Sequence, residues 1–240
     1  MERIGEGAQH PNARAIGVVY LLYFPTAILA GILLKGLVIS SDAAATANNI
    51  LTNEASYRAG FAVGLIGNVI YLAVTALFYR LFRPVNRNIA LVATIFGLVG
   101  CALQIFGGLL QLAPFLILGD GQLSSVFAAP QLQAAALLSL KLYAEIFNIS
   151  FVLFGFFEVL LGYLIFKSTF LPRIIGLLWV CAGMGWLTYL WPPLAKTLSL
   201  YVVLPLGGLA EIALLFWLLV RGVNIVRWQE QAGTGQAGEA

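Results

Sequence analysis

The sequence predicts an all-α, polytopic membrane protein, a bundle of six transmembrane helices with both termini in the cytoplasm. Apolar residues make up 61% of the chain and charged residues 10%, and the mean hydropathy is +0.94. Soluble domains average about 45–50% apolar and about 25% charged residues. The apolar residues also fall in six runs, each long enough to cross about 30 Å of hydrocarbon. A soluble globular protein is therefore excluded.

The predicted spans follow from counting runs of about 20 apolar residues. The first run is too long for the apolar core of a signal peptide, and the acidic residues Glu2 and Glu6 precede it, so we expect an uncleaved first span. The six spans are predicted at residues 15–37, 57–80, 88–116, 136–166, 173–191 and 199–221.

Lysine and arginine predict the orientation. Nine of the 13 basic residues lie on one side of the predicted spans, and Lys35, Arg58 and Lys196 lie on the other. Because basic residues are retained in the cytoplasm, both termini are predicted to be cytoplasmic. We expect a short cytoplasmic segment at 1–12, a single transmembrane domain at 13–222 and a mostly disordered cytoplasmic tail at 223–240. The nine are Arg3, Arg14, Arg80, Arg83, Arg87, Lys167, Arg173, Arg221 and Arg227.

The first outward loop, Ser40–Ser56, has the pattern of a short helix. Ser41 or Asp42 can cap its start, and Ile50 and Leu51 give it a weak apolar face. This pattern predicts a helix on the outer membrane surface.

Several polar residues are predicted to lie at one depth inside the membrane. Counting 1.5 Å per residue from the cytoplasmic ends places Asn68, Gln104 and Glu211 near the middle of their spans. Glu158 lies about 12 Å inside the boundary by the same count, and Thr26 completes the layer. We expect these groups to meet inside the bundle.

The two carboxyl groups of this layer are its most informative members. An acid at the helix centre costs about 2.5–3.5 kcal/mol on insertion scales, and it normally faces a partner or a wet cavity. Glu158 and Glu211 have no Lys or Arg at their own depth, which predicts neutral acids, a shared proton or a bound cation. One interpretation is a proton or ligand site with Asn68 and Gln104. The other is that neutral acids hydrogen-bond neighbouring helices and hold them together.

A second polar cluster is predicted on one face of the fourth span. Lys141, Glu145 and Asn148 are spaced i, i+4 and i+7. Their depth places them at the outer interface, either solvated among headgroups or at the mouth of an outward cavity.

The residues that most enzymes need are scarce. His10 is the only histidine, which argues against a metal or bis-histidine haem site. Cys101 and Cys181 both lie in apolar runs, without metal-ligand spacing. No nucleotide-binding or hydrolase motif occurs, and the basic residues mark span ends instead of a nucleic-acid-binding face. The sequence thus predicts no cofactor, no metal and no nucleic-acid partner.

Four stretches together give the chain a family resemblance. It resembles the bacterial membrane-protein family called domain of unknown function 4386, over roughly residues 13 to 222. The resemblance implies a multi-span inner-membrane protein and supplies no activity, substrate or catalytic residue. The stretches are Arg14–Leu21, Asp42–Leu51, Arg83–Asn88 and Gly162–Gly176.

The sequence leaves three function classes. The first is a proton- or cation-linked carrier of a small molecule that uses the midplane polar layer. The second is a structural or signalling membrane protein whose partner docks on Ser40–Ser56 or Arg83–Asn88. The third, a membrane enzyme that uses only carboxylates and hydroxyls, has no positive support in the residues. Beyond the lipid bilayer, neither a partner nor the oligomeric state is predicted.

Overall fold

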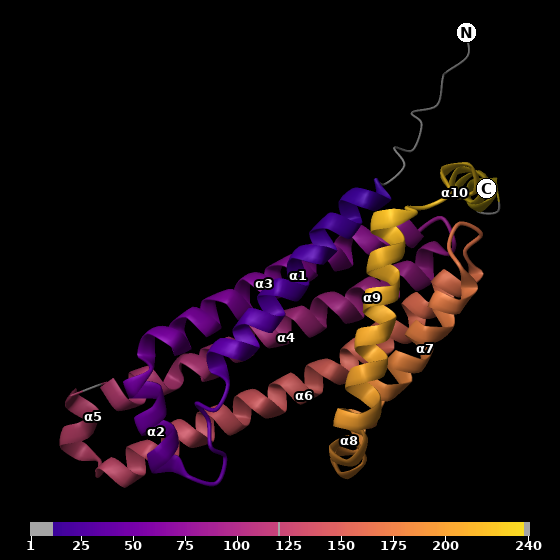
Figure 1. Cartoon of the computed structure of the whole chain (residues 1–240). Coiled ribbons are helices and arrows are strands. Elements are labelled where there is room, and N and C mark those ends of the chain that lie inside the picture. Colours follow the sequence, from indigo (N-terminus) through magenta and orange to yellow (C-terminus); the bar gives the residue numbers. More distant parts are fainter. Residues whose placement is uncertain (1–11, 120, 238–240) are drawn as a thin grey trace.

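A computed structural model describes residues 12–119 and 121–237, and this part of the chain is helical without a strand. Its helices run back and forth between the two ends of the bundle (Figure 1). They are α1 (Ala13–Leu34), α2 (Ala43–Thr52), α3 (Glu54–Phe82), α4 (Arg87–Gly119), α5 (Gly121–Val126), α6 (Ala129–Lys167), α7 (Arg173–Leu187), η1 (Thr188–Leu190), α8 (Pro192–Leu198), η2 (Ser199–Val203), α9 (Leu204–Val220) and α10 (Ile225–Ala237).

The predicted fold class is confirmed. Six helical segments among the described residues are long and apolar enough to span a membrane. Each coincides with a predicted span, although α4 has 33 residues and α6 has 39. At 1.5 Å per residue these two helices are longer than a bilayer requires. They project with α5 from the end of the bundle farthest from the termini (Figure 1).

The projecting end has a small core of its own, and α2 helps to form it. The Asp42 carboxylate caps α2 by accepting a 2.9 Å hydrogen bond from the Ala45 amide, which confirms one of the two predicted caps. Ile50 is fully buried against Leu37, Tyr57 and Leu140, whereas Leu51 is exposed. The apolar face of α2 therefore packs on the protein's own helices.

The main core is aromatic and holds the spans together. Trp179 of α7 is fully buried and donates a 2.9 Å hydrogen bond from Nε1 to the Ala210 carbonyl of α9. The antiparallel pair α6 and α7 approaches backbone to backbone at glycines. A β-carbon at Gly162 would lie 2.6 Å from the Val180 nitrogen, and one at Gly176 would lie 2.7 Å from the Gly162 oxygen. Small residues permit such close packing in membranes.

The sixth span enters the membrane through an irregular turn. Between α8 and α9 the chain forms a π-helix, η2, and Pro205 then lies in the first turn of α9. Proline has no amide hydrogen to donate to the preceding turn, so the helical hydrogen-bond pattern has to change there. The interruption lies directly before the residues of α9 that reach the interior cavity.

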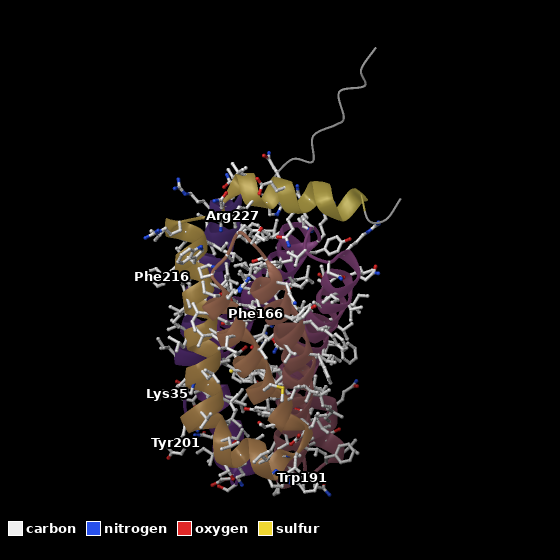
Figure 2. The ribbon with its side chains drawn as sticks, turned by 90° about the vertical axis from the view of Figure 1, so that its right-hand side faces the viewer. Lys35, Phe166, Trp191, Tyr201, Phe216 and Arg227 are labelled. Atoms are coloured by element: carbon white, nitrogen blue, oxygen red, sulfur yellow. The ribbon has the colours of Figure 1, made fainter. Side chains whose placement is uncertain are left out.

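The C-terminal segment differs from its prediction as a mostly disordered tail. Residues 225–237 form helix α10, which lies across the end of the bundle (Figure 2). Trp228 is 1% exposed, and its Nε1 donates a 2.9 Å hydrogen bond to the Leu81 carbonyl of α3. The tail was predicted to be disordered because its composition is polar, and that composition gives no indication that Trp228 anchors it to the bundle. The predicted N-terminal segment at 1–12 lies, apart from Asn12, outside the described residues.

Candidate functional site

A cavity of about 280 Å³ lies between the six spans. Every span contributes to its wall, so no single helix could form the site alone. The wall combines two carboxyl groups, two amides, two phenols, an indole and three phenylalanine rings. Its lining residues are Tyr23, Asn68, Tyr71, Gln104, Phe147, Phe151, Phe154, Glu158, Trp186, Leu204, Gly207, Gly208 and Glu211.

The carboxyl groups of Glu158 and Glu211 face this cavity from α6 and α9. The Glu158 residue is 3% exposed, and its Oε2 has no hydrogen-bond partner among the described residues. Glu211 is better satisfied, because its Oε1 accepts a hydrogen bond of 3.2 Å from the Tyr71 hydroxyl. A buried polar atom without a partner is costly. Glu158 is therefore the group that a ligand or proton would satisfy.

The side-chain amides of Gln104 and Asn68 differ in their hydrogen bonds. Gln104 is held in place, since its Nε2 donates a hydrogen bond of 2.9 Å to Ser150 Oγ, and the Ser150 hydroxyl in turn donates 2.6 Å to the Phe147 carbonyl. The side-chain amide of Asn68, which also lines the cavity, forms no hydrogen bond with another described residue. Its amide is thus available to a molecule in the cavity.

Aromatic rings form the remaining wall. Phe151 stacks on Trp186 with ring centroids 4.5 Å apart and planes inclined by 16°. Tyr71 contacts Tyr23 at 4.8 Å and Phe154 at 5.5 Å between centroids. The Trp186 Nε1 is buried without a hydrogen-bond partner in the described structure. The cavity therefore offers ring faces together with the indole N–H of Trp186 and the carboxyl group of Glu158.

This combination of groups suits positive charge. Among the described residues, no Lys, Arg or His lines the cavity, so no basic side chain there neutralises the carboxyl groups when they ionise. Two carboxylates and several ring faces attract a cation. The described residues include no group of three or more His, Cys, Asp or Glu side chains placed to hold a metal ion.

A second cavity of about 270 Å³ adjoins the first, and both are lined by Tyr23, Asn68, Gln104 and Phe147. It continues between α1, α3 and α4 as far as Leu34, Gly60 and Gln111. These residues lie toward the end of the bundle where α2 packs. Asn68 and Gln104 thus lie where the two cavities meet.

The structure brings the four predicted midplane residues, Asn68, Gln104, Glu158 and Glu211, to one cavity. Thr26 does not line it, because its hydroxyl donates to the Tyr23 carbonyl of its own helix at 2.6 Å. Sequence reasoning did not single out the other polar members of the wall, Tyr23, Tyr71 and Trp186. The spacing of Tyr71 three residues after Asn68 on a helix could have indicated its place on the same face.

Two of the three residues of the predicted outer cluster contact each other. Glu145 and Asn148 line a cleft of about 630 Å³ between α6 and the α8 region, together with Lys196. Asn148 Nδ2 donates a 3.4 Å hydrogen bond to Glu145 Oε2. Lys141 does not line the cleft and forms no ion pair with Glu145. The cleft lies at the end opposite α10, where Figure 2 places Trp191 and Tyr201.

Comparison with known proteins gives a family and no activity. Residues 15–222 match the family described as "Domain of unknown function (DUF4386)". The chain is also similar to an uncharacterized protein of Archaeoglobus fulgidus, with 24% identity over 155 residues, which is 64% of this chain and 78% of that protein. No solved structure matches the chain significantly.

Proposed function

We propose that this chain, which belongs to the family described as "Domain of unknown function (DUF4386)", is a proton- or cation-linked carrier of a small molecule. Of this proposal, the multi-pass membrane architecture is already established. The carrier function is supported by one observation above all: the unpartnered Oε2 of Glu158, buried beside a cavity that Glu211 also lines. An intramembrane acid without a partner is typical of ion and proton pathways.

The ligand that fits this wall is a small monocation, either inorganic or a compact organic amine. Two acids can accept its charge, and the rings of Tyr71, Phe151 and Trp186 can contact its apolar surface. When the cation leaves, a proton on one acid would remove the repulsion between two buried carboxylates. Exchange of a cation for a proton is the simplest cycle that this set of groups supports.

The adjoining cavity supports a route to the site. Asn68 and Gln104 line both cavities, so a cation passing between them stays within reach of amide oxygens. The irregular π-helix before α9 lies next to the cavity residues Leu204, Gly207 and Gly208. Interrupted helices of this kind accompany substrate sites in many transporters.

The finer localisation belongs to the same proposal. We place the protein in a bacterial cytoplasmic membrane with both termini inside, residues 13–222 forming the transmembrane domain. The asymmetry of basic residues supports this orientation.

The test is an infrared titration of the carboxylic-acid band in reconstituted bilayers, with and without tetramethylammonium as a probe cation. The wild type should show a band that responds to bulk pH and to the probe. Glu158→Gln and Glu211→Gln should each lose part of that response. Glu145→Gln is the matched control, since this exposed acid of α6 does not line the central cavity.

A band that never responds to pH, in variants that fold like the wild type, would contradict the proposal. It would favour the alternative of a structural or signalling protein, in which the acids only hold helices together. The band could respond to pH but not to tetramethylammonium, Na⁺ or K⁺. That result would indicate a proton relay and would exclude cation binding at this site. Turnover of an added lipid or quinone that the same variants lose would instead indicate a membrane enzyme.

A further inference from the structure

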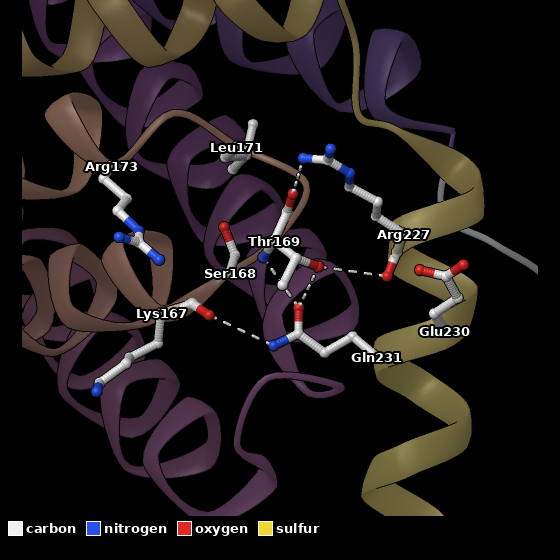
Figure 3. A pocket seen from close by; sticks show the side chains of 8 residues that line it. All are labelled: Lys167, Ser168, Thr169, Leu171, Arg173, Arg227, Glu230 and Gln231. Atoms are coloured by element: carbon white, nitrogen blue, oxygen red, sulfur yellow. Dashed lines mark hydrogen bonds between the residues drawn. The ribbon is translucent and has the colours of Figure 1, made fainter.

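A basic pocket of about 690 Å³ lies at the end of the bundle where α10 crosses it (Figure 3). Three basic residues line it: Lys167 ends α6, Arg173 begins α7, and Arg227 belongs to α10. None of the three forms an ion pair with a carboxylate in the described part of the chain. One acid, Glu230, also lines the pocket, so the basic groups outnumber the acids.

The pocket is a built feature, because polar contacts hold its two walls together. Arg227 Nη1 donates to the Thr169 carbonyl at 3.2 Å. Gln231 Oε1 accepts hydrogen bonds from the Thr169 amide and hydroxyl, each at 3.2 Å. These contacts fix α10 against the turn between α6 and α7. The Lys167 carbonyl also accepts a hydrogen bond of 3.5 Å from Gln231 Nε2. The charged groups of Lys167 and Arg173 take no part in these contacts, and they lie over the rings of Tyr163 and Phe166 at 5.9 and 5.8 Å.

The surface beside these two basic residues is apolar and exposed. Tyr163 and Phe166 on α6 are each 42% exposed, and Ile174 and Leu177 on α7 are 61% and 50% exposed. All four belong to helices that are long and apolar enough to span the membrane. In a bilayer these exposed side chains would face acyl chains, close in sequence to the basic residues of the pocket. A site for a free soluble anion would not need such an apolar surface beside it.

We propose that this pocket binds the phosphate group of an anionic phospholipid, with its acyl chains along the exposed faces of α6 and α7. Arginine and lysine are the residues that hold phosphate oxygens, arginine in bidentate geometry. Basic pockets at the cytoplasmic ends of transmembrane helices are suited to anionic headgroups. A bound lipid would join α6, α7 and α10 through one phosphate.

The experiment compares lipid binding to two double variants of the full chain by native mass spectrometry. Lys167→Gln with Arg173→Gln removes two phosphate contacts and leaves Arg227 to hold α10. At about 1 kcal/mol per basic residue, phosphatidylglycerol should bind roughly 30-fold more weakly. The control, Arg80→Gln with Arg221→Gln, removes two basic residues of the same end that do not line the pocket. It should bind phosphatidylglycerol like the wild type.

Phosphatidylcholine and inorganic phosphate distinguish the source of the phosphate. Neutral phosphatidylcholine should bind weakly and equally to all three proteins, and inorganic phosphate should not displace phosphatidylglycerol. Equal loss of phosphatidylglycerol in both double variants would mean non-specific charge attraction and overturn the proposal. Displacement of the lipid by inorganic phosphate would overturn it too, in favour of a free-anion site.

Discussion

Two buried tyrosines show how single hydroxyl groups contribute to the interior. The Tyr71 hydroxyl donates to Glu211, whereas the Tyr20 hydroxyl is buried without a hydrogen-bond partner among the described residues. Both rings belong to the same aromatic cluster, with centroids 6.2 Å apart. The pair therefore separates the contribution of a hydrogen bond from that of the ring.

Tyr71→Phe should destabilise the protein by about 0.6–1.5 kcal/mol, the range for one interior hydrogen bond. Tyr20→Phe is the matched comparison and should destabilise the protein by less than Tyr71→Phe, because the Tyr20 hydroxyl forms no hydrogen bond of standard geometry with a described residue. The measurement is the free energy of unfolding in mixed micelles. Equal destabilisation by both substitutions would show that the Tyr20 hydroxyl also has a partner.

The sequence located the acids and amides of the cavity but not its rings. Asn68, Gln104, Glu158 and Glu211 stand out because polar residues are costly in an apolar span, and the constant helical rise allows their depths to be compared. Tyr23, Tyr71 and Trp186 are not unusual in such spans. Only the packing of six helices decides which rings face inward.

Among the elements, α6 and α7 depend most directly on small residues. Gly162 and Gly176 face each other across the pair, so close that a β-carbon at either would meet backbone atoms of the other helix. Backbone atoms cannot rotate away as a side chain can. The two helices must therefore move apart if either glycine gains a side chain.

Gly162→Ala should destabilise the protein by about 1–3 kcal/mol, as expected for overpacking. Gly31→Ala is the control, since no atom lies within 4 Å of a β-carbon there, and it should change stability by less than about 0.5 kcal/mol. Thermal unfolding in detergent would measure both. A Gly162→Ala variant as stable as the control would contradict the close approach of α6 and α7.

Helix α10 shows why one element was not predicted. Local composition suggested disorder, and the stabilising contacts are distant in sequence: Trp228 reaches Leu81, and Gln231 reaches Thr169. Such contacts leave no periodic signal in a short polar segment. The long apolar spans are the opposite case, because their length and composition alone require helices in a bilayer.

For the whole molecule, the distribution of charge determines how the bundle should sit in its membrane. The chain crosses six times, so α1 begins and α9 ends at the same end, beside α10 (Figure 1). Eight of the twelve described basic residues lie at this end or on α10. They are Arg14, Arg80, Arg83, Arg87, Lys167, Arg173, Arg221 and Arg227.

Because basic residues are retained in the cytoplasm, we expect α10 inside and α5 outside. Single cysteines at two exposed positions, Ser125→Cys and Gln229→Cys, test this in a variant whose Cys101 and Cys181 are both changed to Ala. A membrane-impermeant maleimide should label Ser125→Cys in intact cells, and Gln229→Cys only after permeabilisation. The reverse labelling pattern would invert the orientation. It would place the basic pocket outside, away from the anionic lipids of the cytoplasmic leaflet, and the α2 end of the adjoining cavity on the cytoplasmic side.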